Sequence, residues 1–185
     1  MKLIQKLQSI AALTLIVGGL AINSQAGEFV PSKGSVSGQN TYAVYTANPF
    51  DAQGNPILGL TFRYAETEGV GRGTLTGKFE VTTRNFVQLA IVDGALVAKV
   101  HGDWIMTTAN GDKLWGTHEF FRPLSGPLFM TGTITTTGGD GRFEGTTGVV
   151  EFNGIVHPDA ATGLDSFEYD YEGVAESIGS NRRNH

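Results

Sequence analysis

The chain has 185 residues, with 18 acidic and 13 basic side chains. Lys2 and Lys6 lie in an expected export leader, so the mature chain keeps 13 − 2 = 11 basic residues and a net charge of 11 − 18 = −7, which argues against nucleic acid or an anionic membrane surface as the main partner. No cysteine is present, which excludes disulfides, a thiol nucleophile and thiolate metal ligation.

The N-terminal segment has the pattern of a secretory signal. Two lysines precede a mostly apolar run over residues 10–22, and Ser24 and Ala26 place small side chains where a signal peptidase cleaves. The run is short for a membrane span of roughly 20 apolar residues. We predict a signal over 1–26, one domain over 27–176 and a polar tail over 177–185. The mature protein is then secreted or periplasmic, in a bacterium, with no membrane span after cleavage; an uncleaved anchor is the alternative.

Nearly every later segment is typical of a β-strand, with period-two alternation or β-branched and aromatic residues between turn residues. No segment of the mature chain has sustained helical spacing of apolar residues. Two neighbouring segments can form one bent strand, so we expect eight or nine strands. The candidates are Val36–Tyr45, Ile57–Glu66, Gly73–Arg84, Phe86–Val92, Ala95–Ala109, Asp112–Arg122, Leu128–Thr137, Gly148–His157 and Ser166–Glu176.

Asn110-Gly111 predicts a tight hairpin between two alternating runs. Asn and Gly tolerate the positive φ angles of a type I′ turn, so a two-residue loop is expected to pair Ala109 with Asp112. This register opposes Met106 to Trp115, Trp104 to Thr117, and Gly102 to Glu119. The face with Trp104, Met106, Trp115 and Phe121 has more large apolar area, so we expect it to face inward, each burial contributing on the order of 2 kcal/mol.

The last strand shows the two faces most clearly. Phe167, Tyr169 and Tyr171 share one face, and acidic residues at 168, 170 and 172 share the other. Successive antiparallel strands with one apolar face bury those faces together and lose their free edges when the sheet closes. We therefore predict an all-β protein with a single closed antiparallel barrel of about eight strands. An interior of this size is either filled by side chains or holds one small ligand.

The C-terminal half carries a family resemblance. Residues 133–148 read TITTTGGDGRFEGTTG and precede Val149, Val150 and Phe152. This resembles the Thr-Gly-Gly-x-Gly-x-Phe-Glu-Gly-x-x-Gly signature of the allene oxide cyclase family, of which dirigent proteins carry a shorter version. The resemblance implies an eight-stranded barrel, often trimeric, with an apolar cavity for a hydrophobic substrate. It leaves room for a homo-oligomer of this chain, a dimer or a trimer.

The cyclase activity does not carry over with the resemblance. The cyclases place a glutamate on the first strand and a cysteine on a later one. Here Val36–Tyr45 has no acidic residue and cysteine is absent. The architecture is therefore expected without the cyclase chemistry.

The glycine-rich segment is expected to be a structural turn. A dinucleotide-binding loop has to open a helix, whereas a strand follows here. We expect Gly138, Gly139 and Gly141 to supply unusual backbone angles, Phe143 to enter the barrel end, and Gly145 and Gly148 to permit close packing.

Glu119 is the candidate acid or base. In the predicted register it points inward beside Trp104 and Trp115, where desolvation raises the pKa of a carboxyl group. If the faces swap at a bulge near the rim, Glu119 lies instead at the wet mouth. On the opposite face, a polar cluster forms either a histidine-orienting site or an outward ion pair, and comprises His101, Asp103, His118 and Arg122.

We predict no metal site and no cofactor, because the four histidines lack metal-ligand spacing. The leading hypothesis is a non-catalytic barrel that binds a small hydrophobic molecule. The alternatives are a cyclase or isomerase that uses Glu119, and a structural envelope or matrix protein with a filled barrel. The expected ligand-binding residues are Trp104, Met106, Trp115, Phe121, Tyr169 and Tyr171.

Overall fold

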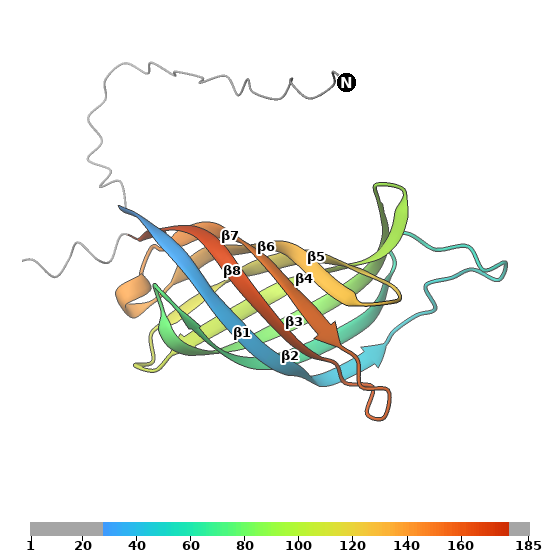
Figure 1. Cartoon of the computed structure of the whole chain (residues 1–185), viewed down its shortest axis with the longest axis horizontal. Helices are drawn as coiled ribbons and strands as arrows, with labels where there is room; N and C mark the ends of the chain where they lie inside the picture. The colour runs from blue at the N-terminus through green and yellow to red at the C-terminus, as the bar shows by residue number, and fades with distance from the viewer. Residues whose placement is uncertain (1–27, 178–185) are drawn as a thin grey trace, which may run out of the picture.

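The computed structural model describes residues 28–177, which form eight strands and one 3₁₀ turn (Figure 1). The expected segments 73–84 and 86–92 are one strand, β3. The predicted signal and nearly all of the predicted tail lie outside the described residues. The elements are β1 (Glu28–Tyr45), β2 (Thr61–Gly73), β3 (Gly77–Val92), β4 (Ala95–Thr108), β5 (Lys113–Pro123), β6 (Leu128–Gly139), η1 (Gly141–Phe143), β7 (Thr147–His157) and β8 (Ser166–Ser177).

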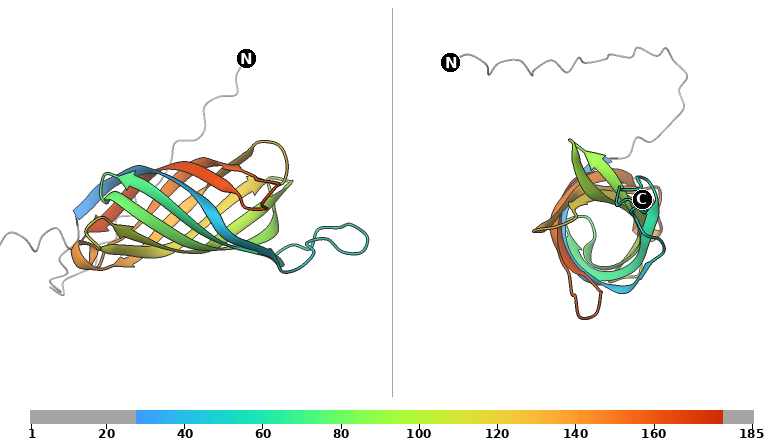
Figure 2. Two further views of the ribbon diagram at one scale, coloured as in Figure 1. Left: turned by 90° about the horizontal axis from the view of Figure 1, so that it is seen from below. Right: turned by 90° about the vertical axis from the view of Figure 1, so that its right-hand side faces the viewer.

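The strands close into a single barrel. Each strand pairs antiparallel with the next, and β1 pairs with β8 from Glu28–Ser177 to Gln39–Ser166. The end-on view in Figure 2 shows the resulting ring. The predicted all-β, eight-stranded antiparallel barrel is thus confirmed. Within residues 28–177, no helix is long and apolar enough to cross a membrane.

The barrel has two distinct ends. The Phe143 end carries the β2–β3 and β4–β5 turns and the η1 turn between β6 and β7. The Asp165 end carries the connections 46–60 and 158–165, together with the β3–β4 and β5–β6 turns. The 46–60 connection extends away from the barrel in Figure 1. The interior differs between these ends: it is filled at the Phe143 end and charged at the Asp165 end.

Inward glycines make room for large side chains inside the barrel. A Cβ on Gly71 would overlap the Phe79 ring, and one on Gly73 would overlap the Tyr171 hydroxyl. A Cβ on Gly132 would lie 2.5 Å from the Cβ of Phe120. Alternation of small and large inward residues is how a narrow barrel accommodates aromatic rings.

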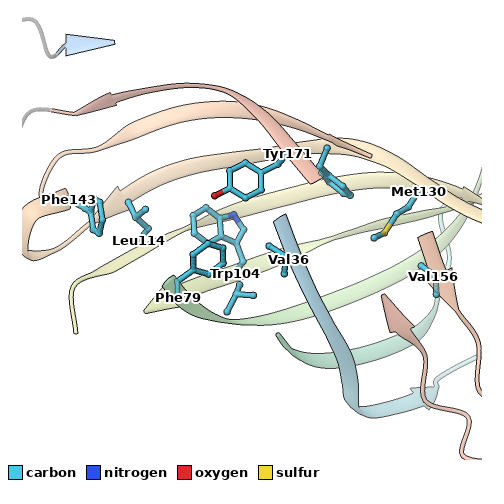
Figure 3. Packing of buried hydrophobic residues seen from close by; sticks show 10 residues of the cluster. Val36, Phe79, Trp104, Leu114, Met130, Phe143, Val156 and Tyr171 are labelled. Atoms are coloured by element: carbon cyan, nitrogen blue, oxygen red, sulfur yellow. The ribbon is translucent and has the colours of Figure 1, made fainter. Parts of the chain in front are cut away.

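The Phe143 end is filled by apolar side chains (Figure 3). Phe143 is 1% exposed and lies beside Leu114, which confirms that it enters the barrel end. Tyr171, Phe79 and Trp104 pack further along the interior. The inward placement of Phe167, Tyr169 and Tyr171, opposite the exposed acidic residues of β8, is also as predicted.

The glycine-rich turn works somewhat differently from the prediction. Positive φ occurs at Gly141 (59°) and Gly145 (74°), but not at Gly138 or Gly139. Close approach requires glycine at 139, where a Cβ would lie 2.7 Å from the Phe143 carbonyl oxygen, whereas a Cβ on Gly138 would lie 2.8 Å from Nε1 of the exposed Trp115 side chain. Gly148 packs closely, as expected, since its Cβ would lie 2.6 Å from the Val174 carbonyl oxygen.

The predicted register of the β4–β5 hairpin is wrong by one residue. Met106 pairs with Leu114, not with Trp115. Thr108 N–H donates to the Asp112 carbonyl oxygen at 2.9 Å, which leaves a three-residue loop, and of its residues only Gly111 has positive φ (89°). Such a loop is the next most common hairpin connection after the two-residue turns.

A two-residue hairpin turn occurs instead at Asp93-Gly94. Both residues have positive φ, 49° and 79°, and the flanking Val92 and Ala95 pair. These angles are those of a type I′ turn, for which Asp-Gly is a favoured sequence.

The register error exchanges the two faces of β5. A shift of one residue moves every side chain of a strand to the opposite face. Trp104 faces inward at 5% exposure, as predicted, whereas Trp115 is 39% exposed on the outside. Leu114, His118 and Phe120 are inside instead.

Candidate lumenal site

A cavity of about 110 Å³ lies in the lumen between the filled Phe143 end and the Asp165 end. Its walls combine aromatic and aliphatic side chains with a few polar groups. The aromatic and sulfur-containing lining residues are Trp104, Met106, Phe120, Met130, Phe152, Phe167 and Tyr169. The charged and hydrogen-bonding ones are Asn40, Arg63, Thr67, Thr83, Asn85, His118, Arg122 and Asp165.

The structure places three of the six expected ligand residues on this cavity: Trp104, Met106 and Tyr169. Tyr171 is inward but belongs to the filled part of the core. The predicted inward orientation of Trp115 and Phe121 is wrong, since both lie on the outer face of β5, where the Lys99 ammonium is 6.0 Å from the Phe121 ring centroid.

Sequence reasoning did not place in the lumen the residues that replace them there, and it assigned two of these, His118 and Arg122, to the polar cluster on the opposite face. Phe120, His118 and Arg122 share the inner face of β5, and the correct hairpin register would have identified all three. Arg63 had no signal of its own, because a bulge between Thr61 and Arg63 breaks the alternation of β2. Strand faces alone therefore cannot place it.

Edge-to-face and tilted aromatic pairs form one wall of the cavity. Phe120 and Phe152 have ring centroids 5.6 Å apart, and Phe152 and Tyr169 are 4.9 Å apart. These separations are typical of favourable aromatic packing. Burial raises the pKa of the Tyr169 hydroxyl, so the group stays neutral. Trp104 donates from Nε1 to the Thr117 carbonyl oxygen at 3.1 Å, which fixes the indole in the wall.

A chain of polar side chains on the lumenal face links β2, β3 and β5. Thr67 and Thr83 hydroxyls are 2.6 Å apart, and Asn85 Nδ2 donates to Thr83 at 2.7 Å. The Asn85 oxygen is therefore the acceptor for His118 Nε2, 2.7 Å away, which assigns the proton to Nε2 and the lone pair to Nδ1. Burial lowers the pKa of His118 to about 4, despite the opposing attraction of Asp103, so its imidazole is neutral at pH 7.

Glu119 does not face the lumen, so the predicted inward carboxylate is wrong. Its side chain is 46% exposed and pairs with Lys99 at 2.7 Å across the outer face of β4 and β5. The one-residue register shift explains this outcome, because it turns Glu119 outward and brings its neighbour His118 inward.

The expected polar cluster is divided between the two faces of the wall. Asp103 lies outside and pairs with Arg84 at 2.8 Å. His101 also faces outward and stacks on Phe86, with centroids 5.8 Å apart. His118 and Arg122 line the lumen. The four residues therefore do not form one site, and the outward Asp103 forms an ion pair, although with an arginine that the prediction did not include.

Two arginines and one aspartate line the cavity at the Asp165 end. Arg63, 6% exposed, donates from Nη1 to Asp165 at 2.8 Å, and its Nε is buried without a hydrogen-bond partner. Arg122 forms no ion pair within residues 28–177. Burial lowers the pKa of Arg122 and Asp165 opposes this effect, but an arginine remains charged in proteins.

The rest of the molecule offers weaker candidates for a site. Among the described residues, no group of three or more His, Asp or Glu side chains is arranged to hold a metal ion. A larger depression of about 1410 Å³ on the outer face is open to solvent and bordered by charged side chains such as Arg72, Glu80 and Asp170. The lumenal cavity has the mainly apolar walls and few convergent polar groups typical of small-molecule sites.

Fold and site together define a closed antiparallel barrel with a partly apolar lumenal cavity and a charged end. No family model, curated protein or solved structure matches the chain. The resemblance to allene oxide cyclases thus stays a prediction that rests on the glycine-rich segment.

Proposed function

We propose that this barrel binds a small, largely apolar molecule in its lumen. The observation that carries the proposal is the cavity of about 110 Å³ beside Trp104, lined mainly by apolar and aromatic side chains. The resemblance of residues 133–148 to allene oxide cyclases points the same way, because it implies an apolar cavity. We further propose, from the predicted signal, that the protein acts outside the cytoplasm.

Binding ranks ahead of catalysis because the carboxylate that lines the lumen, Asp165, is already paired with Arg63 and the other two candidate groups are less suitable. Glu119, the predicted catalytic group, lies outside. His118 borders the cavity, but its pKa of about 4 makes it a weak base at neutral pH, where general bases work best with a pKa near 7. No observation therefore favours a proton-transfer reaction over simple binding.

The test is a titration of the Trp115→Phe protein with benzyl alcohol, monitored by the fluorescence of the remaining Trp104. We expect a saturable change, since Trp104 lines the cavity. Ala65→Leu adds bulk at a buried lining position and is expected to abolish this change. Thr82→Leu, on the exposed face of β3, is the control and should bind as before.

Mass spectrometry of the protein extracted under native conditions is the complementary measurement. A co-purified molecule that is lost in Ala65→Leu supports the proposal. Absence of both a bound molecule and a Trp104 response contradicts it and favours a barrel with a structural role.

A further inference from the structure

We infer that the lumenal ligand is a small carboxylic acid with one aromatic ring, whose carboxylate lies between Arg122 and Arg63 and whose ring lies against the aromatic wall. This inference rests on the proposed function and names its ligand class. It is argued from the charge balance of the cavity, the orphaned arginine donors and the size of the apolar part.

The charges that line the cavity do not balance. The titratable groups on its wall are Arg63, Arg122, Asp165, His118 and Tyr169. His118 and Tyr169 are neutral at pH 7, so two guanidinium groups face one carboxylate. Arg122 is half-buried. A charge that is partly removed from water without a partner is costly, and an anionic ligand group would compensate it.

The unused hydrogen-bond donors point to the same place. Arg63 directs Nη1 to Asp165 at 2.8 Å and Nη2 to the Gly163 carbonyl oxygen at 3.5 Å, which leaves its buried Nε without an acceptor. Arg122 interacts electrostatically with both Asp165 and Arg63, which places the two guanidinium groups at the same end of the lumen. Paired guanidinium donors suit a planar carboxylate, which accepts through two oxygens.

Cavity size and lining define the rest of the ligand. An apolar cavity of roughly 150 Å³ admits benzene in another protein, so about 110 Å³ limits the apolar part to the size of a single ring. Phe120, Phe152 and Tyr169 present ring faces and edges to this space. A long alkyl chain would have to displace the packed side chains of the Phe143 end.

The inference is tested by calorimetric titration of the purified protein at pH 7 and low salt with phenylacetate and with the uncharged phenylacetamide. We expect phenylacetate to bind ~10- to 100-fold more tightly than the amide, the range for one or two charge-assisted hydrogen bonds. Arg122→Gln should remove at least ~10-fold of the phenylacetate affinity and leave phenylacetamide within about twofold. The control is Arg84→Gln, which changes an exposed arginine of the outer face and should leave both affinities unchanged.

Each contrary result has a distinct meaning. Equal affinity for phenylacetate and phenylacetamide would overturn the acid assignment and leave lumenal binding intact. Acetate or sulfate binding as tightly as phenylacetate would reduce the site to a simple anion site and overturn the aromatic part. Binding of neither aromatic compound, nor of benzyl alcohol, would overturn this inference together with the proposed function. Because the acid–amide comparison uses the unmodified protein, it decides the question even if Arg122→Gln fails to fold.

Discussion

At the scale of single residues, His118 shows how burial sets a protonation state. Its imidazole is 8% exposed, lies in the cavity wall and donates to Asn85, in a lumen that already holds the charges of Arg63 and Arg122. A second proton would place a further positive charge there. Desolvation is the main reason that the pKa of His118 is lowered to about 4, and the attraction of Asp103 opposes it.

This lowered pKa predicts a specific loss of stability in acid. The unfolded chain takes up the proton near pH 6.5 and the folded protein only near pH 4. The contribution of neutral His118 to the free energy of unfolding is therefore fully present above about pH 6.5 and is lost as the pH falls toward 4. We expect His118 to account for on the order of 3 kcal/mol of this loss. The measurement compares urea denaturation of the wild type and His118→Gln at pH 7 and pH 4.5.

Gln at position 118 keeps a donor for Asn85 but does not titrate, so its stability should depend less on pH. The matched control is His157→Gln, which removes an exposed imidazole beside Glu168 and should preserve the wild-type pH dependence. Identical pH profiles for the wild type and His118→Gln would contradict the prediction.

At the scale of elements, the β4–β5 hairpin shows which parts of the fold sequence patterns can predict. Alternation identified both strands, and it placed Phe167 and Tyr169 of β8 on the correct face. Alternation does not determine the register of the hairpin, because two alternating strands can pair equally well after a shift. The predicted register therefore depended on the length of the loop alone. Asn110-Gly111 suggested a two-residue loop, whereas the hydrogen bonds of Thr108 close a three-residue loop.

The error spread from this loop to the candidate site. The one-residue error in the predicted register placed Trp115 and Glu119 in the lumen, although both lie outside. It also placed His118 outside, although His118 lines the cavity. The charged end was beyond sequence reasoning for another reason. Arg63 and Asp165 are distant in sequence, and only barrel closure, with the bulge in β2, brings them together.

Two glycines of this hairpin should differ in what an added methyl group costs. Gly111 has φ of 89° and open space where a Cβ would lie, so Gly111→Ala costs only the strain of the left-handed backbone, ~1–2 kcal/mol. At Gly102 a Cβ would overlap the Arg84 carbonyl oxygen. Gly102→Ala must displace a paired backbone and should cost roughly 3 kcal/mol or more.

Thermal and urea denaturation of the two alanine variants provide the comparison. If Gly102→Ala is no more destabilising than Gly111→Ala, then β3 and β4 do not approach each other closely at this point. Retention of fold in Gly111→Ala would show that the loop tolerates strain, as its exposed position at the Phe143 end suggests.

At the scale of the whole molecule, the Arg63–Asp165 pair joins parts of the chain that barrel closure brings together. Arg63 is the first residue of β2 that pairs with β1, and Asp165 directly precedes β8, across the β1–β8 seam. The backbone of Asn40 on β1 donates to the Asp165 carbonyl oxygen at 2.8 Å. Asp165 therefore links the start of β8 to β1 through its backbone and to β2 through its side chain.

A second Arg–Asp pair with the same geometry makes this contribution measurable. Arg63–Asp165 and Arg84–Asp103 both have an N–O distance of 2.8 Å, but their side chains are 8% and 16% exposed in the first pair and 65% and 50% in the second. Asp165→Asn leaves a buried guanidinium without its counter-charge and should cost about 3–5 kcal/mol. Asp103→Asn breaks an exposed pair and should cost less than about 1 kcal/mol.

The two free energies of unfolding, measured by urea denaturation at pH 7, decide whether burial distinguishes the pairs. Salt should weaken the outer pair further, because an exposed pair is screened, and should affect the lumenal pair much less. Equal costs for the two substitutions would mean that solvent reaches Arg63 and that the Asp165 end is open. A closed end further predicts that Arg63→Met with Asp165→Leu recovers most of the stability lost in Asp165→Asn.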